Sequence, residues 1–172
     1  MAASHWPPFS FEEKVMKDPI REQLIENLRG GHAHVTLEAA LKNFPKRLRG
    51  VKPAGVSYSA WQLLEHLRIA QSDILEFSRD PKHVSPKWPE GYWPKAEKPP
   101  SEAAWTKSIA AIQKDAAAME RLIANPKTDL FAKIPHGTGQ NILREALLIA
   151  DHNAYHIGQL VLIRRLLGAW EG

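Results

Sequence analysis

The most informative part of this 172-residue chain is TGQNILREALLIADHNAYHIGQLVLIRRLLG, residues 138–168, which contains no proline. Its apolar residues recur every three or four positions, as they do on one side of an α-helix. This apolar stripe consists of Ile142, Ala146, Ile149, Leu160, Ile163 and Leu167. At about 1.5 Å per residue such a helix is roughly 40 Å long, which is enough to span a whole helical bundle.

Three further helices are predicted, each between a capping residue and a glycine or proline stop. The clearest start is Ser59, because Gln62 three positions later completes a capping box. Gly30-Gly31 interrupts the first helix, and a shorter helical piece follows it. The predicted ranges are 18–30 with the shorter piece over 35–44, then 59–80 and 101–125.

The fold class predicted from this pattern is all-α. No segment alternates apolar and polar residues in the way that a strand requires, and no internal repeat is present. Amphipathic helices of this length bury their apolar stripes against one another, which indicates a four-helix bundle. With 44% hydrophobic residues, we expect one domain over residues 1–172.

A long loop rich in proline and tryptophan separates the second and third main helices. Residues 79–100 contain six of the thirteen prolines, together with Trp88, Tyr92 and Trp93. Proline stiffens the backbone and large aromatic rings are costly to leave in water, so an ordered segment is expected. The loop could cover the bundle as a lid. It could equally plug an end of the core or meet a second subunit.

The composition limits the chemistry and the location. There is no cysteine, so disulfides, thiolate nucleophiles and cysteine-bound zinc sites are excluded, and any metal must be held by nitrogen or oxygen. The first eighteen residues lack the apolar core of a signal peptide, and no later run is long enough to span a bilayer. We expect a cytoplasmic protein without membrane contact.

A net charge of +4 raises the question of nucleic-acid binding, because basic surfaces gain affinity by releasing counterions from phosphate. The only dense basic run lies over residues 46–52, in a segment that contains proline and glycine but no aromatic residues for base stacking. Recognition motifs are missing as well. We therefore expect no nucleic-acid partner, and we interpret the run as solvated loop charge.

His152 and His156 are four residues apart in the last predicted helix, so they project from one face about one turn apart. The spacing alone is weak evidence, since such pairs are often ordinary surface residues. Here, however, both histidines fall on the stripe that contains Ile149, Leu160 and Ile163. Unpartnered polar rings in an apolar seam cost several kcal/mol, so these two need partners or a metal.

His66 provides a third imidazole from the second main helix. It lies three residues after Leu63 and four before Ala70, which places it beside that helix's apolar stripe. Three converging imidazoles form a facial nitrogen set that leaves coordination positions open for water or substrate. A single core histidine is usually just a hydrogen-bonded packing residue. Three in one bundle favour one divalent metal ion on His66, His152 and His156.

The residues between His152 and His156 do not match the zinc-peptidase motif H-E-x-x-H, because no glutamate follows the first histidine. This pattern disfavours peptidase chemistry, and no residue is assigned a catalytic role. Tyr155 and Gln159 lie beside the stripe, where they could line a pocket, although packing is the more common role. Three nearby carboxylates could orient an imidazole or lie in solvent, namely Glu65, Asp73 and Asp151.

Two stretches, WQLLEHLRIAQ (residues 61–71) and ADHNAYHIGQL (residues 150–160), resemble the DinB-like superfamily of small bacterial metalloproteins. The resemblance covers nearly the whole chain, and the three-histidine pattern is its most specific element. It implies a four-helix bundle that is commonly a homodimer. It also implies nickel or zinc, or else manganese or iron, on the matching His66, His152 and His156.

Characterised members of this superfamily include thiol S-transferases that use bacillithiol or mycothiol, and a mycothiol-dependent maleylpyruvate isomerase. The hypothesis favoured here is a metal-dependent enzyme, either a hydrolase or a low-molecular-weight-thiol S-transferase, that acts on a small molecule. Its metal ion would activate water or a thiol. The alternative is a non-catalytic metal-binding stress-response protein, in which the same site stabilises the bundle or senses metal.

Overall fold

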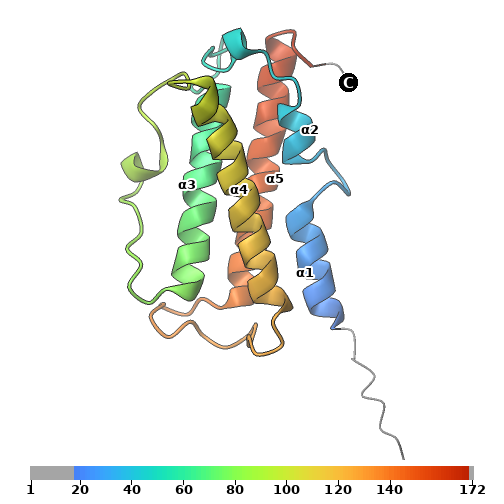
Figure 1. The fold of residues 1–172 in the computed structure, drawn as a ribbon, viewed down its shortest axis with the longest axis vertical. Coiled ribbons are helices and arrows are strands. Elements are labelled where there is room, and N and C mark those ends of the chain that lie inside the picture. Colours follow the sequence, from blue (N-terminus) through green and yellow to red (C-terminus); the bar gives the residue numbers. More distant parts are fainter. Residues whose placement is uncertain (1–17, 171–172) are drawn as a thin grey trace, which may run out of the picture.

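The computed structural model describes residues 18–170, and the elements in this range are all helical (Figure 1). The only strand-like pairing among these residues is one isolated bridge between Lys133 and Asn141. The predicted all-α bundle with four main helices is therefore confirmed. The helices are α1 (Pro19–Arg29), α2 (Leu37–Leu41), α3 (Ala60–Arg79), α4 (Glu102–Ala124) and α5 (Ile142–Leu166), with 3₁₀ turns at Lys46–Leu48 and Glu90–Tyr92.

The packing order of the helices differs from their order along the chain. Helix α3 contacts both α4 and α5, and α1 contacts the same two helices, while the short α2 packs against α5. Figure 1 shows α3, α4 and α5 running side by side, with α1 and α2 stacked along the other side of the bundle. The α3–α5 contact brings residues about 86 positions apart in the chain next to one another.

The start of α5 corrects one prediction. The helix was expected to open near Thr138, but it begins at Ile142. Asn141 is extended, and its side chain accepts a hydrogen bond from the backbone N–H of Arg144, as an N-cap does. The residues before it form a turn in which the Ile134 N–H donates to the Gln140 carbonyl. The helix nevertheless runs for 25 residues, or about 37 Å.

The predicted capping box at the start of α3 is present. The Ser59 hydroxyl accepts from the Gln62 N–H at 3.2 Å, and the Gln62 side chain accepts from the Ser59 N–H at 3.2 Å. The same hydroxyl donates to the main-chain carbonyl of Glu97, which lies in the loop between α3 and α4. Ser59 therefore starts the helix and also holds the end of the long loop against it.

Two apolar clusters fill the bundle, one at each end. The first joins α2 to the beginning of α3 and the end of α5, and contains Leu63 and Leu160. The second joins α1 to the end of α3 and the beginning of α5, and contains Leu75 and Ile149. Between them, at the middle of the α3–α5 contact, the chain places polar side chains, of which Gln71 is only 1% exposed.

The basic run over residues 46–52 is tied into the fold. The Arg49 side chain is buried, donates to the carboxylate of Glu102 at 2.9 Å and lies over the Trp105 ring. Lys46 and Lys52 pair with Glu102 and Glu97. Within residues 18–170 every helix is too short or too polar to span a bilayer. The prediction of a single domain over residues 1–172 stays a prediction.

The Ser59→Ala substitution should lower the free energy of unfolding by about 1–2 kcal/mol, because it removes an N-cap and leaves the Glu97 carbonyl without its donor. Denaturant unfolding followed by circular dichroism measures this loss. Ser57→Ala, at an exposed position two residues earlier, should change stability by less than about 0.5 kcal/mol. Equal effects of the two substitutions would contradict the assigned role of Ser59.

Candidate metal centre

The three predicted histidines meet where α3 lies against α5. His66 comes from α3 and is 3% exposed, His156 from α5 is 7% exposed, and His152, also from α5, is half-buried. One ring nitrogen from each can be chosen so that all three lie within 4.8 Å of one another. The Nε2 atoms of His66 and His152 are 3.0 Å apart. The predicted convergence of the three imidazoles is thus confirmed.

Hydrogen bonds on the far side of two rings determine which nitrogen is free. Nδ1 of His66 lies 3.0 Å from the main-chain carbonyl oxygen of Tyr92, and Nδ1 of His156 lies 2.6 Å from Oε1 of Gln159. Both partners are amide oxygens that can only accept, so in each ring we assign the proton to Nδ1. Nε2 of each neutral ring then carries the lone pair, and in His66 this nitrogen lies 3.0 Å from Nε2 of His152.

Burial keeps these rings neutral. Burial, together with the charges that His156 and His66 would carry, lowers the pKa of His152 to about 4, and the Asn153 side chain opposes this shift. Burial also lowers the pKa of His66 and of His156, against the opposing effect of their hydrogen bonds. Neutral imidazoles are the form that binds metal ions.

The three-nitrogen set fits a divalent ion. In a tetrahedral zinc site, bonds of about 2.0–2.1 Å place two nitrogen ligands about 3.3 Å apart, close to the 3.0 Å between the Nε2 atoms of His66 and His152. Imidazole suits zinc, nickel, copper and iron. The group could therefore hold a metal ion, and the donor set does not identify which one.

The long loop covers one side of the centre. The Trp93 ring stacks on His66 with ring centroids 4.0 Å apart and planes 5° apart, and Tyr58 stacks on Trp93. Tyr92, the residue before, supplies the carbonyl that His66 bonds. Figure 1 shows the loop running along the outside of α3. Tyr92 and Trp93 therefore cover this side of α3, whereas Trp88 is 67% exposed. Contact of the loop with a second subunit stays a prediction.

None of the three nearby carboxylates makes a hydrogen bond to these imidazoles. Asp73 accepts from the Tyr92 hydroxyl at 2.5 Å and bonds His83 at 2.7 Å, so it anchors the loop to α3. Burial and Asp73 together raise the pKa of Tyr92 to about 12. Glu65 pairs with a neighbouring arginine on the same helix, and Asp151 is exposed. The groups that orient the rings are instead a main-chain carbonyl and an amide.

The other described histidines lie apart from the centre, in agreement with the surface or loop positions predicted for them. Each has a local partner of its own: His32 bonds Glu26, His34 bonds the Val35 carbonyl, His83 bonds Asp73 and His136 bonds the Phe77 carbonyl. His5, for which an irregular segment was predicted, lies outside the described residues.

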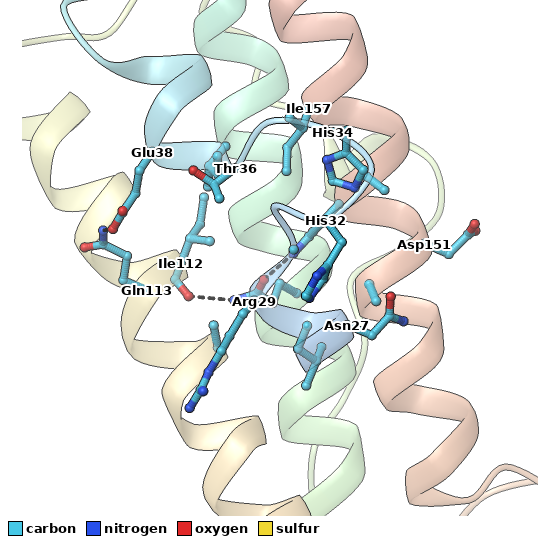
Figure 2. A pocket seen from close by; sticks show the side chains of 18 of the residues that line it. Asn27, Arg29, His32, His34, Thr36, Glu38, Ile112, Gln113, Asp151 and Ile157 are labelled. Carbon is cyan, nitrogen blue, oxygen red and sulfur yellow. Dashed lines mark hydrogen bonds between the residues drawn. The ribbon is translucent and has the colours of Figure 1, made fainter. Parts of the chain in front are cut away.

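A cavity of about 700 Å³ lies on the other side of α5, bounded by α1, the α1–α2 connection, α4 and α5 (Figure 2). None of the three histidines of the centre lines it. Gln71 and Asn153 do, and Asn153 follows His152 directly in the chain. Asn153 therefore borders the cavity and is next in the chain to a histidine of the metal centre.

Comparison with known proteins identifies one family. A model of the DinB superfamily matches residues 32–160. This range includes all of α3 and the part of α5 from Ile142 to Leu160. His66, His152 and His156 all lie within the match. No curated protein and no solved structure matches the chain significantly.

Stability should depend on pH through the buried rings. Because the pKa of His152 is about 4 in the folded chain and about 6.5 when unfolded, the unfolded state binds more protons between these values. The free energy of unfolding, measured with a chelator present, should therefore fall as the pH drops from about 6.5 to 4. His152→Gln should lose less stability over this window. Parallel pH profiles for the two proteins would refute the assignment.

Proposed function

Since the chain belongs to the DinB superfamily, we propose that it is a metal-dependent enzyme that binds one divalent ion on His66, His152 and His156. The observation that supports this most directly is the convergence of three buried ring nitrogens from two helices. Hydrogen bonds to Tyr92 and Gln159 leave two of the three Nε2 atoms free to act as ligands. Nickel or zinc is the proposed ion, with manganese or iron as alternatives.

The proposed reaction is hydrolysis or transfer of a low-molecular-weight thiol to a small electrophile. A divalent ion with three nitrogen ligands and open positions lowers the pKa of a bound water or thiol towards neutrality. The protein's part is to hold the imidazoles and to shield one side of them with Trp93. No carboxylate in the described range bonds the three rings, and the residue after His152 is asparagine rather than the glutamate of the zinc-peptidase motif.

We also propose a homodimer, which is supported by one face of α5. Tyr155, Leu162 and Leu166 are spaced seven and four residues apart, so they follow one side of the helix, and all three are exposed. Exposed apolar stripes of this kind are typical of interfaces. Light scattering, which measures the mass of the particle in solution, tests this proposal.

Protein purified without a His-tag should contain about one divalent ion per chain, and His152→Ala should lose most of it because one of three ligands is gone. Elemental analysis measures the content directly. His136→Ala is the matched control, since His136 bonds the Phe77 carbonyl and lies outside the centre. Equal metal content in the unsubstituted chain and the His152→Ala variant would rule out the proposed site.

Turnover of electrophilic substrates, measured with and without bacillithiol or mycothiol, separates the two proposed reactions. Consumption of the thiol indicates transfer, whereas product formation without thiol indicates hydrolysis. In both cases we expect activity to be lost on chelation and restored by adding the ion. If chelation lowers the melting temperature but no substrate is turned over, the site is structural or sensory and the enzymatic proposal is wrong.

A further inference from the structure

Two buried polar atoms beside the metal centre have no hydrogen-bond partner. They are Nδ1 of His152 and the amide oxygen Oδ1 of Asn153, on consecutive residues of α5. A buried polar atom without a partner costs about 1–3 kcal/mol, and native folds rarely leave one. In the tautomer that can ligate a metal ion through Nε2, Nδ1 of His152 carries the proton and is a donor, so it is chemically complementary to the acceptor Oδ1.

The orientation of the Asn153 amide is determined by a chain of hydrogen bonds. The Ile112 carbonyl can only accept, so the Gln71 side chain must direct its NH₂ group to it, at 2.7 Å. This orientation leaves Oε1 of Gln71 to accept from Nδ2 of Asn153, also at 2.7 Å. The amide of Asn153 therefore cannot flip without breaking this bond, and Oδ1 is the atom left over for another donor.

His152 is the one ring of the three that lacks an acceptor for Nδ1–H. His66 has the Tyr92 carbonyl and His156 has the Gln159 side chain, and these bonds leave their Nε2 atoms free. The Asn153 side chain already interacts with the His152 imidazole in the sense that favours a proton on the ring. With an acceptor at this position, Nδ1–H of all three histidines would have a hydrogen-bond partner.

Accordingly, we propose that Asn153, held in place by Gln71, is a positioning residue that accepts a hydrogen bond from Nδ1–H of His152. This bond selects the tautomer in which Nε2 of His152 can ligate a metal ion. The inference rests on the proposed metal site and assigns Asn153 no contact with the ion itself. Gln71 lies in the buried middle of α3, and its hydrogen bond to Asn153 keeps the amide in this orientation.

A purely structural role for Asn153 is the competing explanation, because its amide also fills the polar layer between the two apolar clusters. Asn153→Ala and Asn153→Asp distinguish the two. Both remove the NH₂ group that bonds Gln71, and only the alanine variant also removes the unpartnered side-chain oxygen proposed as the acceptor. A structural role therefore predicts similar losses for both variants, whereas a positioning role predicts rescue by aspartate.

Zinc affinity, measured at pH 7 by competition with a chromophoric chelator, should fall about 10–100-fold in Asn153→Ala and stay within a few-fold of the unsubstituted chain in Asn153→Asp. Gln113→Ala is the control, because Gln113 lines the same cavity but bonds Glu38. It should leave the affinity unchanged. Equal weakening by both Asn153 variants, or no weakening by alanine, would overturn the positioning role.

The negative charge of aspartate could by itself raise zinc affinity. A spectroscopic measurement of the Nδ1 proton distinguishes this effect from the hydrogen bond. In the zinc-loaded chain, the Nδ1 proton of His152 should give a slowly exchanging ¹H–¹⁵N signal that disappears in Asn153→Ala and persists in Asn153→Asp. The Nδ1 proton of His66, bonded to the Tyr92 carbonyl, is the internal reference and should persist in all three proteins. A His152 signal that survives in the alanine variant would refute the inference. Failure of the unsubstituted chain to bind zinc would count against the proposed metal site as well.

Discussion

The burial of three imidazoles at the α3–α5 contact is the constraint around which the rest of this structure is arranged. A buried ring must be neutral and its nitrogens must have partners, because an unpaired polar atom away from water costs more than most contacts contribute. Two apolar clusters, one at each end of the bundle, hold α3 and α5 together and leave a polar layer between them. The histidines occupy that layer, and one ring nitrogen of each lies within 4.8 Å of the other two.

The long loop between α3 and α4 has a specific part in this arrangement. It supplies the carbonyl of Tyr92 and the stacked ring of Trp93 on the α3 side of the centre. Asp73 anchors the loop through the Tyr92 hydroxyl, and Ser59 holds its end through the Glu97 carbonyl. This loop, which contains the 3₁₀ turn Glu90–Tyr92, is thus attached at two points to α3 and its N-cap, on the helix that carries His66. These attachments and the stiff proline-rich backbone explain how the loop can hold the His66 ring in one orientation.

The sequence predicted three helix caps correctly, but it misplaced the start of α5 and did not predict which groups bond the imidazoles. The capping residues Asp18, Ser59 and Ser101 were predicted correctly, because an N-cap bonds backbone groups two or three residues away. The start of α5 was misplaced because Asn141 competes with Thr138 as a cap, and a turn closed by Ile134 and Gln140 favours the later start. Carboxylates were considered as partners of the imidazoles, whereas the structure uses a carbonyl and an amide.

The amino-acid sequence was sufficient to establish the helical class, the DinB resemblance and the identity of the three histidines. Periodicity and capping depend on neighbours within one turn, and an H-x-x-x-H pair in a helix necessarily shares one face. Tertiary structure decided which helices touch, how near the rings come, and that the Tyr92 carbonyl faces the outer nitrogen of His66. These features arise from contacts between residues far apart in the chain, such as His66 with His152 and Gln71 with Asn153. No local pattern in the sequence encodes them, because they depend on how the helices pack.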